Sequence, residues 1–277
     1  MCVVLVVGLC RHKGAGAVWM VKYMHDADLI KQWKAEENRA FSGWDFSHIN
    51  GRWHFDEPPW DYKAVVKTYL KDTDILLDMG TGGGEVLLTL NHPYRNTYAT
   101  EAYAPNFELC KNTLSPLGIS VVQTYNDERL DKLPFENDTF DFIINRHESF
   151  DLTEVDRTLK PGGYFVTQQV GNKNDHEFMQ KLNDGYIPHS SEHTIDKYCS
   201  TLANLGYEIV KTDEFQCPIR FYDVGALVFL AKILVWEFPE FSVRTHIDKL
   251  RSYQKEIDEK GFLQGTAHRF LIVARKM

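Results

Sequence analysis

The strongest constraint on the fold is an alternation of short apolar runs with helical patterns, which begins at Ile75 and continues to the end of the chain. Such alternation is typical of parallel strands joined by crossover helices. We therefore predict an α/β fold with a doubly wound, mostly parallel sheet of seven strands and helical cap segments. The expected strands are Ile75–Met79, Thr97–Thr100, Ser120–Thr124, Phe140–Asn145, Tyr164–Val170, Tyr207–Thr212 and Phe270–Ala274.

Two segments lie outside this alternation and divide the chain. The first is crowded with aromatic residues between Asp28 and Tyr62, and the second precedes the last strand. The predicted parts are residues 1–62 as an N-terminal extension and aromatic cap segment, 63–217 as the ligand-binding core, 218–265 as a helical cap insertion, and 266–277 as the final strand of the core.

Charge and hydrophobicity exclude several classes of protein. The 31 basic and 39 acidic side chains give a formal net charge of −8, which argues against binding nucleic acid mainly through phosphates. The apolar run Val3–Leu9 is too short for a membrane span. The apolar helical pattern Val224–Trp236 is also too short and contains Lys232, so we expect that helix to be buried or to face a partner. The five scattered cysteines suggest neither disulfides nor a thiolate metal site. We predict a cytoplasmic protein without bound metal or membrane.

The densest chemical signal is the stretch Leu77–Glu85, which reads L-D-M-G-T-G-G-G-E and lies between a strand and a helix. Such a glycine loop lets a nucleotide-like ligand approach the backbone closely. A dinucleotide site needs a third glycine where this chain has Glu85, and its pyrophosphate would be repelled by Asp78 and Glu85. S-adenosylmethionine has no phosphate and carries a cationic amine and a sulfonium, so these acidic side chains favour it.

Several motifs resemble the class I S-adenosylmethionine-dependent methyltransferases. D-x-G-x-G at Asp78–Gly82 resembles their motif I. Leu133–Asp141 is similar to the L-P-F-x-x-x-x-F-D run of the methyltransferase type 11 group, and Lys160–Tyr164 resembles its L-K-P-G-G turn. The resemblance implies a Rossmann-like sheet with an antiparallel last strand, S-adenosylmethionine as the cofactor, and methyltransferase activity. The combination of Arg146–Glu148 after the fourth strand, Thr167–Gly171 after the fifth and Asp223–Leu227 further on resembles a bacterial subset of this group, for which it implies no particular substrate.

The same resemblance implies the cofactor contacts. Asp78, Gly80, Thr81 and Gly82 form the loop. Glu101, followed by Ala102, stands about 20 residues further on, where the family has an acid that accepts both ribose hydroxyls. An acid at this spacing also suits NAD, so Glu101 alone does not discriminate between the two cofactors.

The contact to the adenine amino group is the least regular part of the motif set. The family commonly has Gly-Asp-Ala after the third strand, whereas residues 125–132 of this chain read Y-N-D-E-R-L-D-K. We choose Asp127 for this role and keep Asn126 as a near-equal alternative. A solvated charged loop is the remaining interpretation.

Methyl transfer is expected at the carboxyl end of the fourth strand, because ligands of open α/β sheets bind at the switch point. His147 titrates near neutrality and is our candidate general base, oriented by Glu148 or Asp151. Alternatively, His147 caps the following helix or packs against the cofactor. Arg146 is included among the cofactor-binding candidates, and it could instead bind a carboxylate on the substrate or pair with nearby acids.

Two further groups of side chains are expected near the ligands. Gln168 and Gln169 end the fifth strand, and only one of them can face the site because side chains alternate along a strand. Trp60 and Tyr62 are the aromatic residues nearest the first strand and are our candidates for the cofactor side. In the resembled superfamily such segments cover the carboxyl edge of the sheet and exclude water.

The sequence therefore favours a methyltransferase that acts on a small or medium organic molecule at O or N. The acidic charge makes nucleic acid an unlikely partner, although an RNA-base methyltransferase stays as an alternative. A non-catalytic sensor that binds S-adenosylmethionine is the second alternative, because binding and turnover share the same residues.

Overall fold

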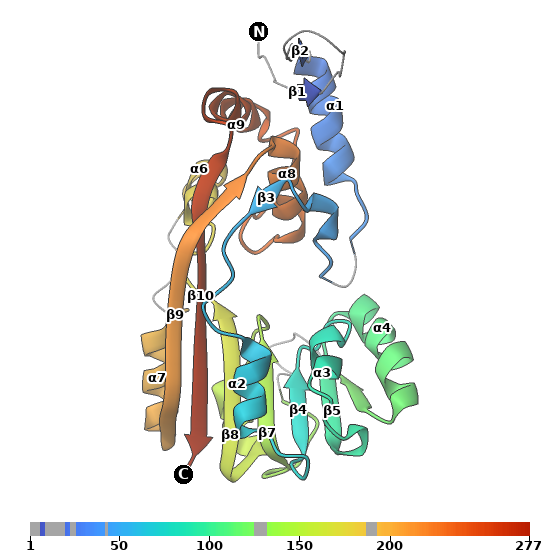
Figure 1. The fold of residues 1–277 in the computed structure, drawn as a ribbon, viewed down its shortest axis with the longest axis vertical. Helices are drawn as coiled ribbons and strands as arrows, with labels where there is room; N and C mark the ends of the chain where they lie inside the picture. The colour runs from blue at the N-terminus through green and yellow to red at the C-terminus, as the bar shows by residue number, and fades with distance from the viewer. Residues whose placement is uncertain (1–5, 9–19, 23–25, 42–43, 125–131, 187–192) are drawn as a thin grey trace, which may run out of the picture.

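The main sheet of the protein is a mixed sheet of eight strands. The computed structural model describes residues 6–8, 20–22, 26–41, 44–124, 132–186 and 193–277. The strand order is β3-β9-β10-β8-β7-β4-β5-β6 (Figure 1). The strands are β3 (Trp53–His54), β4 (Leu76–Met79), β5 (Thr97–Glu101), β6 (Ser120–Gln123), β7 (Phe140–Arg146), β8 (Leu159–Val170), β9 (Tyr207–Phe221) and β10 (Leu263–Lys276). A separate pair is formed by β1 (Val6–Gly8) and β2 (Met20–Lys22).

The strand directions confirm the predicted doubly wound sheet. Strands β4 to β8 pair with one another in parallel. The last strand, β10, is antiparallel to both β8 and β9, as expected. The structure adds an eighth strand, because β3 pairs with the outer edge of β9. Its two residues are too few to show a strand period in the sequence.

Helices cover both faces of the sheet. The helices are α1 (Asp26–Glu37), α2 (Tyr62–Tyr69), α3 (Glu85–Thr89), α4 (Ala104–Leu114), α5 (Leu152–Thr158), α6 (His176–Leu182), α7 (Ile195–Asn204), α8 (Val224–Ile233) and α9 (Ile247–Lys260). Short 3₁₀ turns are η1 (Ser47–Ile49), η2 (Tyr94–Asn96) and η3 (Ser115–Leu117). Helices α2, α3 and α4 pack on one face and α5 and α7 on the other. All four residues of β4 are buried between these layers.

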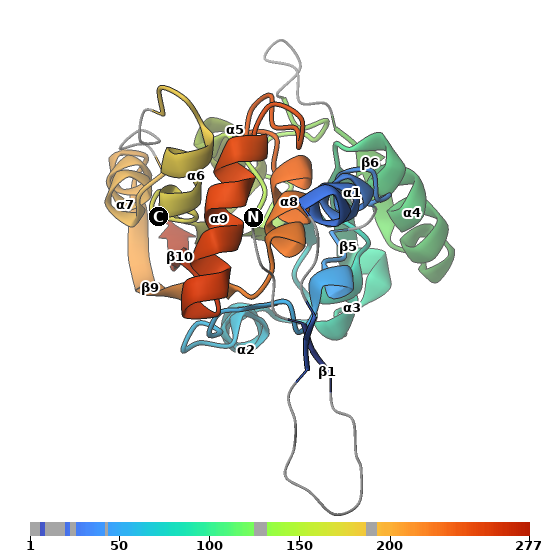
Figure 2. The ribbon, with the colours of Figure 1, turned by 90° about the horizontal axis from the view of Figure 1, so that it is seen from above.

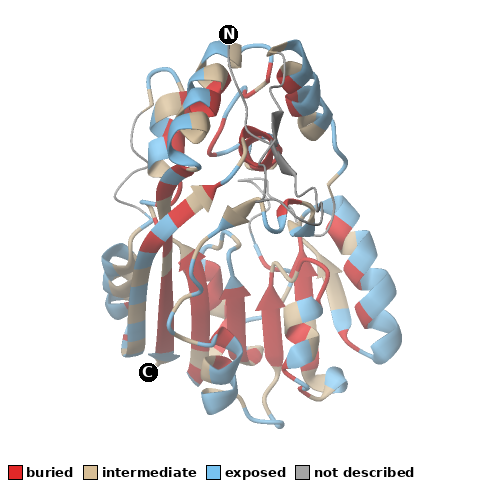
Figure 3. Cartoon of the chain, turned by 45° about the horizontal axis from the view of Figure 1, so that its top comes forward, coloured by how far each residue is buried: buried red, intermediate tan, exposed pale blue. Residues whose placement is uncertain are grey.

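The remaining helices form a second lobe above the carboxyl edge of the sheet, which we call the cap. Strands β9 and β10 extend beyond β8 into the cap, where α6, α8 and α9 pack against them and α1 packs against α8 (Figures 1 and 2). Helix α8 is the centre of the cap core, and every residue from Val224 to Ala231 is buried (Figure 3). Of the two predicted environments for this apolar helix, the structure shows the buried one.

The predicted division into parts is not marked by a break in the chain. Its boundaries at residues 217 and 265 fall inside β9 and β10, which run without interruption from the core into the cap. The four parts therefore stay a prediction. Across the described ranges, no helix combines the length and apolar character needed to cross a bilayer.

Candidate functional site

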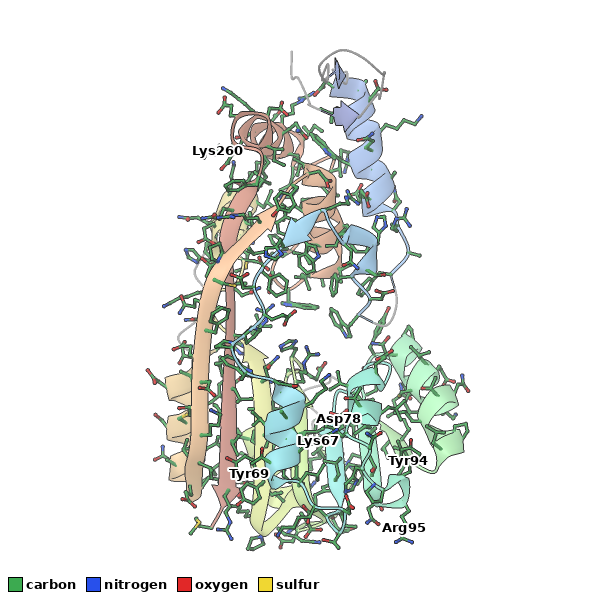
Figure 4. All side chains as sticks on the ribbon, in the orientation of Figure 1. Lys67, Tyr69, Asp78, Tyr94, Arg95 and Lys260 are labelled. Carbon is green, nitrogen blue, oxygen red and sulfur yellow. The ribbon has the colours of Figure 1, made fainter. Side chains whose placement is uncertain are left out.

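The glycine loop lies at the upper end of β4, which faces the cap (Figure 4, where Asp78 is labelled). The N–H groups of Gly80 and Thr81 both donate to the carbonyl oxygen of Thr100, at 3.0 Å each, and hold the loop against β5. Gly80, Gly82 and Gly84 have φ angles of 70°, 62° and 87°. These left-handed conformations explain why glycine stands at all three positions.

Three carboxyl groups converge on this loop. Asp78 is 7% exposed, and burial, followed by the nearby charge of Glu101, raises its pKa to about 7. Glu101 is buried, and its carboxylate accepts hydrogen bonds from the N–H groups of Gly82 and Tyr103, at 2.8 Å each. Burial nevertheless raises the pKa of Glu101.

The third carboxyl group belongs to Glu148, whose side chain lies against Gly80. A Cβ added at Gly80 would overlap the Glu148 side chain. Burial, followed by the charge of Glu101, raises the pKa of Glu148. Three acids with raised pKa values around one loop destabilise one another as anions, so a cationic ligand would relieve their repulsion. A pyrophosphate would add to it.

His147 lies at the end of β7 and has a left-handed backbone, with φ of 62°. Its N–H donates to the carbonyl oxygen of Gln168 at 2.9 Å, and its Nε2 is 3.0 Å from Nε2 of Gln168. Neither predicted orienting residue bonds to it. Glu148 lies over Gly80, and Asp151 caps α5 through the N–H of Thr153 at 2.8 Å. The partner of His147 is therefore Gln168.

The two adjacent glutamines point to different partners, as the alternation along β8 requires. Gln168 joins His147 to Trp60, whose indole N–H donates to Oε1 of Gln168 at 2.8 Å. Gln169 instead donates to the side-chain oxygens of Asn145 and Thr167. Both glutamines are buried. Trp60 thus reaches the rim of the site through Gln168.

The other predicted residues occupy several positions. Tyr62 is buried and donates to the carbonyl oxygen of Asn145 at 3.2 Å. Arg146 is exposed beside His147, and its charge acts to lower the pKa of Asp78. Ala102 follows Glu101, and its backbone N–H acts to lower the pKa of that carboxyl group, against the larger effect of burial. Thr81 has a buried hydroxyl beside Asp78. Asp127 and Asn126 lie outside the described residues.

Two residues near the site were not singled out by the sequence reasoning. Trp44 reaches down from the cap, since its Cδ1 would lie 3.7 Å from a Cβ built on Gly82. Arg269 in β10 is close enough to His147 for its charge to lower the pKa of that ring. Trp44 was one ring among many in an aromatic segment, and Arg269 is separated from His147 by more than a hundred residues. No sequence signal connects either of them to the loop.

A metal site finds no support among the residues that the structure describes, where no group of three or more His, Cys, Asp or Glu side chains is placed to hold an ion.

Comparisons with known proteins identify the central part of the chain. Residues 77–167 match the family model described as a methyltransferase domain. The chain contains a methyltransferase domain. The match begins at the glycine loop and ends at β8, so it covers the three carboxyl groups and His147. It confirms the resemblance to the class I enzymes and, with it, S-adenosylmethionine as the cofactor of such a domain.

Similar whole proteins support the same domain and fold. An uncharacterized methyltransferase of Anoxybacillus flavithermus is 25% identical over 138 residues, which are 48% of this chain and 62% of that relative. A functionally unknown protein of Deinococcus radiodurans R1 superposes with a TM-score of 0.53 at 14% identity, over 80% of this chain and 89% of that chain. The YcgJ protein of Bacillus subtilis gives a TM-score of 0.51 at 18% identity, over 78% of this chain and 97% of that chain. The two solved structures show that the fold is shared.

Proposed function

We propose that the whole chain transfers a methyl group from S-adenosylmethionine to a small or medium organic acceptor at O or N. The observation that carries this proposal is the convergence of Asp78, Glu101 and Glu148 on the glycine loop. Burial raises the pKa of all three groups, and the charge of Glu101 raises those of Asp78 and Glu148 further, so a ligand that brings positive charge would stabilise their anions. A ligand with an ammonium and a sulfonium supplies that charge, whereas a dinucleotide does not.

The proposed cofactor contacts follow the loop. The backbone of Gly80, Thr81 and Gly82 would lie along the cofactor, with Asp78 beneath it and Glu101 on the ribose hydroxyls. Ala102 belongs to the same set. Arg146 was predicted with it, but its exposed position beside His147 assigns it to the acceptor. Asp127 stays a prediction for the adenine amino group.

The chain's own contribution to the reaction is mainly alignment. S-adenosylmethionine supplies an activated methyl group when bound. Transfer from a sulfonium is an in-line displacement, so the acceptor must be held opposite the sulfur. His147, at the carboxyl end of β7, is the proposed acceptor-side residue, and its left-handed backbone fits a strained functional position. The cap, with Trp44 against the loop, would exclude water.

The two alternatives have less support. A sensor that holds a partner through α8 loses its main argument, because α8 is buried within the cap. RNA methylation is disfavoured by the net charge of −8. A cytoplasmic location stays a prediction from the sequence.

The experiment is a screen for S-adenosylhomocysteine release from S-adenosylmethionine with a panel of small acids, alcohols and amines. Turnover of any acceptor, lost in Asp78→Asn, supports the proposal. Saturable cofactor binding with no turnover across the panel would favour the sensor. Retention of the protein on RNA at physiological salt would favour the RNA alternative.

A further inference from the structure

A hydrogen-bond chain from Trp60 through Gln168 fixes the proton on His147. The indole N–H of Trp60 can only donate, so the group it meets at 2.8 Å must be the amide oxygen of Gln168. The amide nitrogen of Gln168 then faces Nε2 of His147 at 3.0 Å. An amide NH₂ only donates, so Nε2 of His147 must accept.

The consequence is a neutral ring with its proton on Nδ1. A protonated imidazolium would place an N–H of His147 against the N–H of Gln168, which is two donors facing each other. Desolvation by the surrounding protein, followed by the charges of Arg269 and Arg146, lowers the pKa of His147 well below its usual value, in agreement with this arrangement. His147 is nevertheless an exposed residue, so the protein surrounds only part of it. No described residue forms a hydrogen bond with Nδ1.

His147 therefore presents a donor at the carboxyl edge of the sheet, and its only lone pair is engaged by Gln168. In this state it has no free nitrogen with which to take a proton from an acceptor. This differs from the general-base role expected from the sequence. A donor suits a group that arrives already carrying a lone pair and a negative charge.

Positive charge accompanies this donor. Arg146 is the residue before His147, is exposed, and makes no hydrogen bond or ion pair with any described residue. The strand register pairs Arg146 with Gln168 and Gln168 with Leu271, two residues beyond Arg269. Residues paired across strands share a face of the sheet, so Arg146, Gln168 and Arg269 lie on the same face.

Arg269 already has partners within the protein. Its Nη1 donates to Oδ1 of Asn174 at 2.6 Å and to the carbonyl oxygen of His268 at 2.8 Å. Burial lowers the pKa of Arg269, and the nearby charges of Asp175 and Glu237 oppose this shift. Arg146 has no such described partner beyond the influence of Asp78. It is the cation left available to a ligand.

We propose that the methyl acceptor is an oxygen acid that binds as its anion, held by the guanidinium of Arg146 and the Nδ1–H of His147. This inference rests on the proposed methyltransferase function and specifies its substrate class. The oxygen anion attacks the methyl carbon, the O–C bond forms, the S–C bond breaks, and the electron pair of that bond stays on sulfur. The negative and positive charges cancel, and no proton needs to be removed, so no base is required.

The first test reads the ring directly and needs neither cofactor nor turnover. Histidine ¹⁵N NMR of the full chain near neutral pH, with the His147 signals assigned from their loss in His147→Asn, should show a neutral ring with a proton on Nδ1. Gln168→Glu keeps an acceptor for Trp60 but places a carboxylate at Nε2, so the proton should move to Nε2. Gln216→Glu on the exposed side of β9 is the charge-matched control and should change nothing. A proton on Nε2 in the wild type, or an imidazolium, would overturn the proposal.

The second test measures anion binding with a matched pair of probes, benzoate and benzamide, which differ in charge but hardly in shape. Calorimetric titration of the full chain, with and without S-adenosylhomocysteine, should give saturable benzoate binding that weakens about tenfold or more in Arg146→Gln. Equal binding of benzamide, absence of benzoate binding, or no effect of Arg146→Gln would refute the acceptor class. Failure of the methyltransferase proposal is distinguishable, since it would appear as no binding of S-adenosylhomocysteine while benzoate still bound.

Discussion

Replacing Asp78 with asparagine should stabilise the cofactor-free protein while removing its affinity for the cofactor. The carboxyl group is 7% exposed, and burial raises its pKa from 3.8 to about 7. The folded state therefore binds this proton more tightly than the unfolded state does. Its stabilising contribution is fully present below about pH 4 and is lost as the pH rises toward 7. A shift of about three pKa units corresponds to about 4 kcal/mol, an upper value.

The assay is urea unfolding of the wild type and Asp78→Asn without cofactor across this pH range. Relative to the wild type, the free energy of unfolding of the variant should rise by about 1.4 kcal/mol per pH unit between about pH 4 and 7. Above pH 7 the difference should stay constant. Asp72→Asn, on the exposed turn before β4, is the control and should show no such slope. A difference that does not depend on pH, or a variant less stable than the wild type above pH 7, would refute the reasoning.

Adding S-adenosylmethionine should reverse the order of stability. A ligand that binds only the folded state stabilises it according to its concentration relative to Kd. The wild type should therefore gain stability with added cofactor, whereas Asp78→Asn should not. The buried charge of Asp78 therefore destabilises the cofactor-free wild type, and the cationic ligand offsets this destabilisation.

Three further changes test the loop and the cap. Glu101→Gln should weaken cofactor binding by about tenfold or more in calorimetry, because it removes a charged acceptor from the N–H of Gly82; unchanged affinity would mean that Glu101 does not face the cofactor. Gly84→Ala should lower the free energy of unfolding by about 2–4 kcal/mol, since φ is 87° and the new Cβ would lie 2.7 Å from Cδ2 of Leu114. Gly185→Ala, with φ of 74° and open space around it, is the control and should lower the free energy of unfolding by only about 1–2 kcal/mol. Equal losses in Gly84→Ala and Gly185→Ala would contradict the packing argument. Arg52→Ala should destabilise the cap by about 1.5–3 kcal/mol in urea unfolding, because Arg52 holds both oxygens of Asp223 at 2.8 and 2.6 Å; a loss below about 0.5 kcal/mol would contradict this.

The core of the fold could be predicted because its signals are local. The run Ile75–Met79 is apolar and ends at a glycine loop, and the structure places β4 at Leu76–Met79. The upper part of β9 was missed because the expected strand ended at Thr212 and residues from Pro218 onward were assigned to the insertion, although Phe215 and Ile219 alternate with polar residues as in a half-buried strand.

The site was only partly predictable for a similar reason. The order of Asp78, Gly80 and Glu101 is a sequence pattern, and the structure brings them together through the hydrogen bond from Gly82 to Glu101. The partner of His147 is Gln168, which is 21 residues away in the sequence. The two meet because β7 pairs with β8, and the indole of Trp60, from a third segment, orients the amide of Gln168. Sequence spacing alone favoured the neighbouring acids Glu148 and Asp151. The directions of the side chains decide which polar neighbour forms a hydrogen bond with the imidazole ring, and sequence spacing does not give these directions.

The most direct test of the central claim is calorimetric titration of the full chain with S-adenosylmethionine, S-adenosylhomocysteine and NAD, in parallel with Asp78→Asn. We predict saturable binding of the two sulfur ligands to the wild type, no binding of either to the variant, and no binding of NAD to either protein. Binding of NAD without a response to S-adenosylmethionine, or unchanged affinity in Asp78→Asn, would contradict the assignment of the glycine loop as the cofactor site.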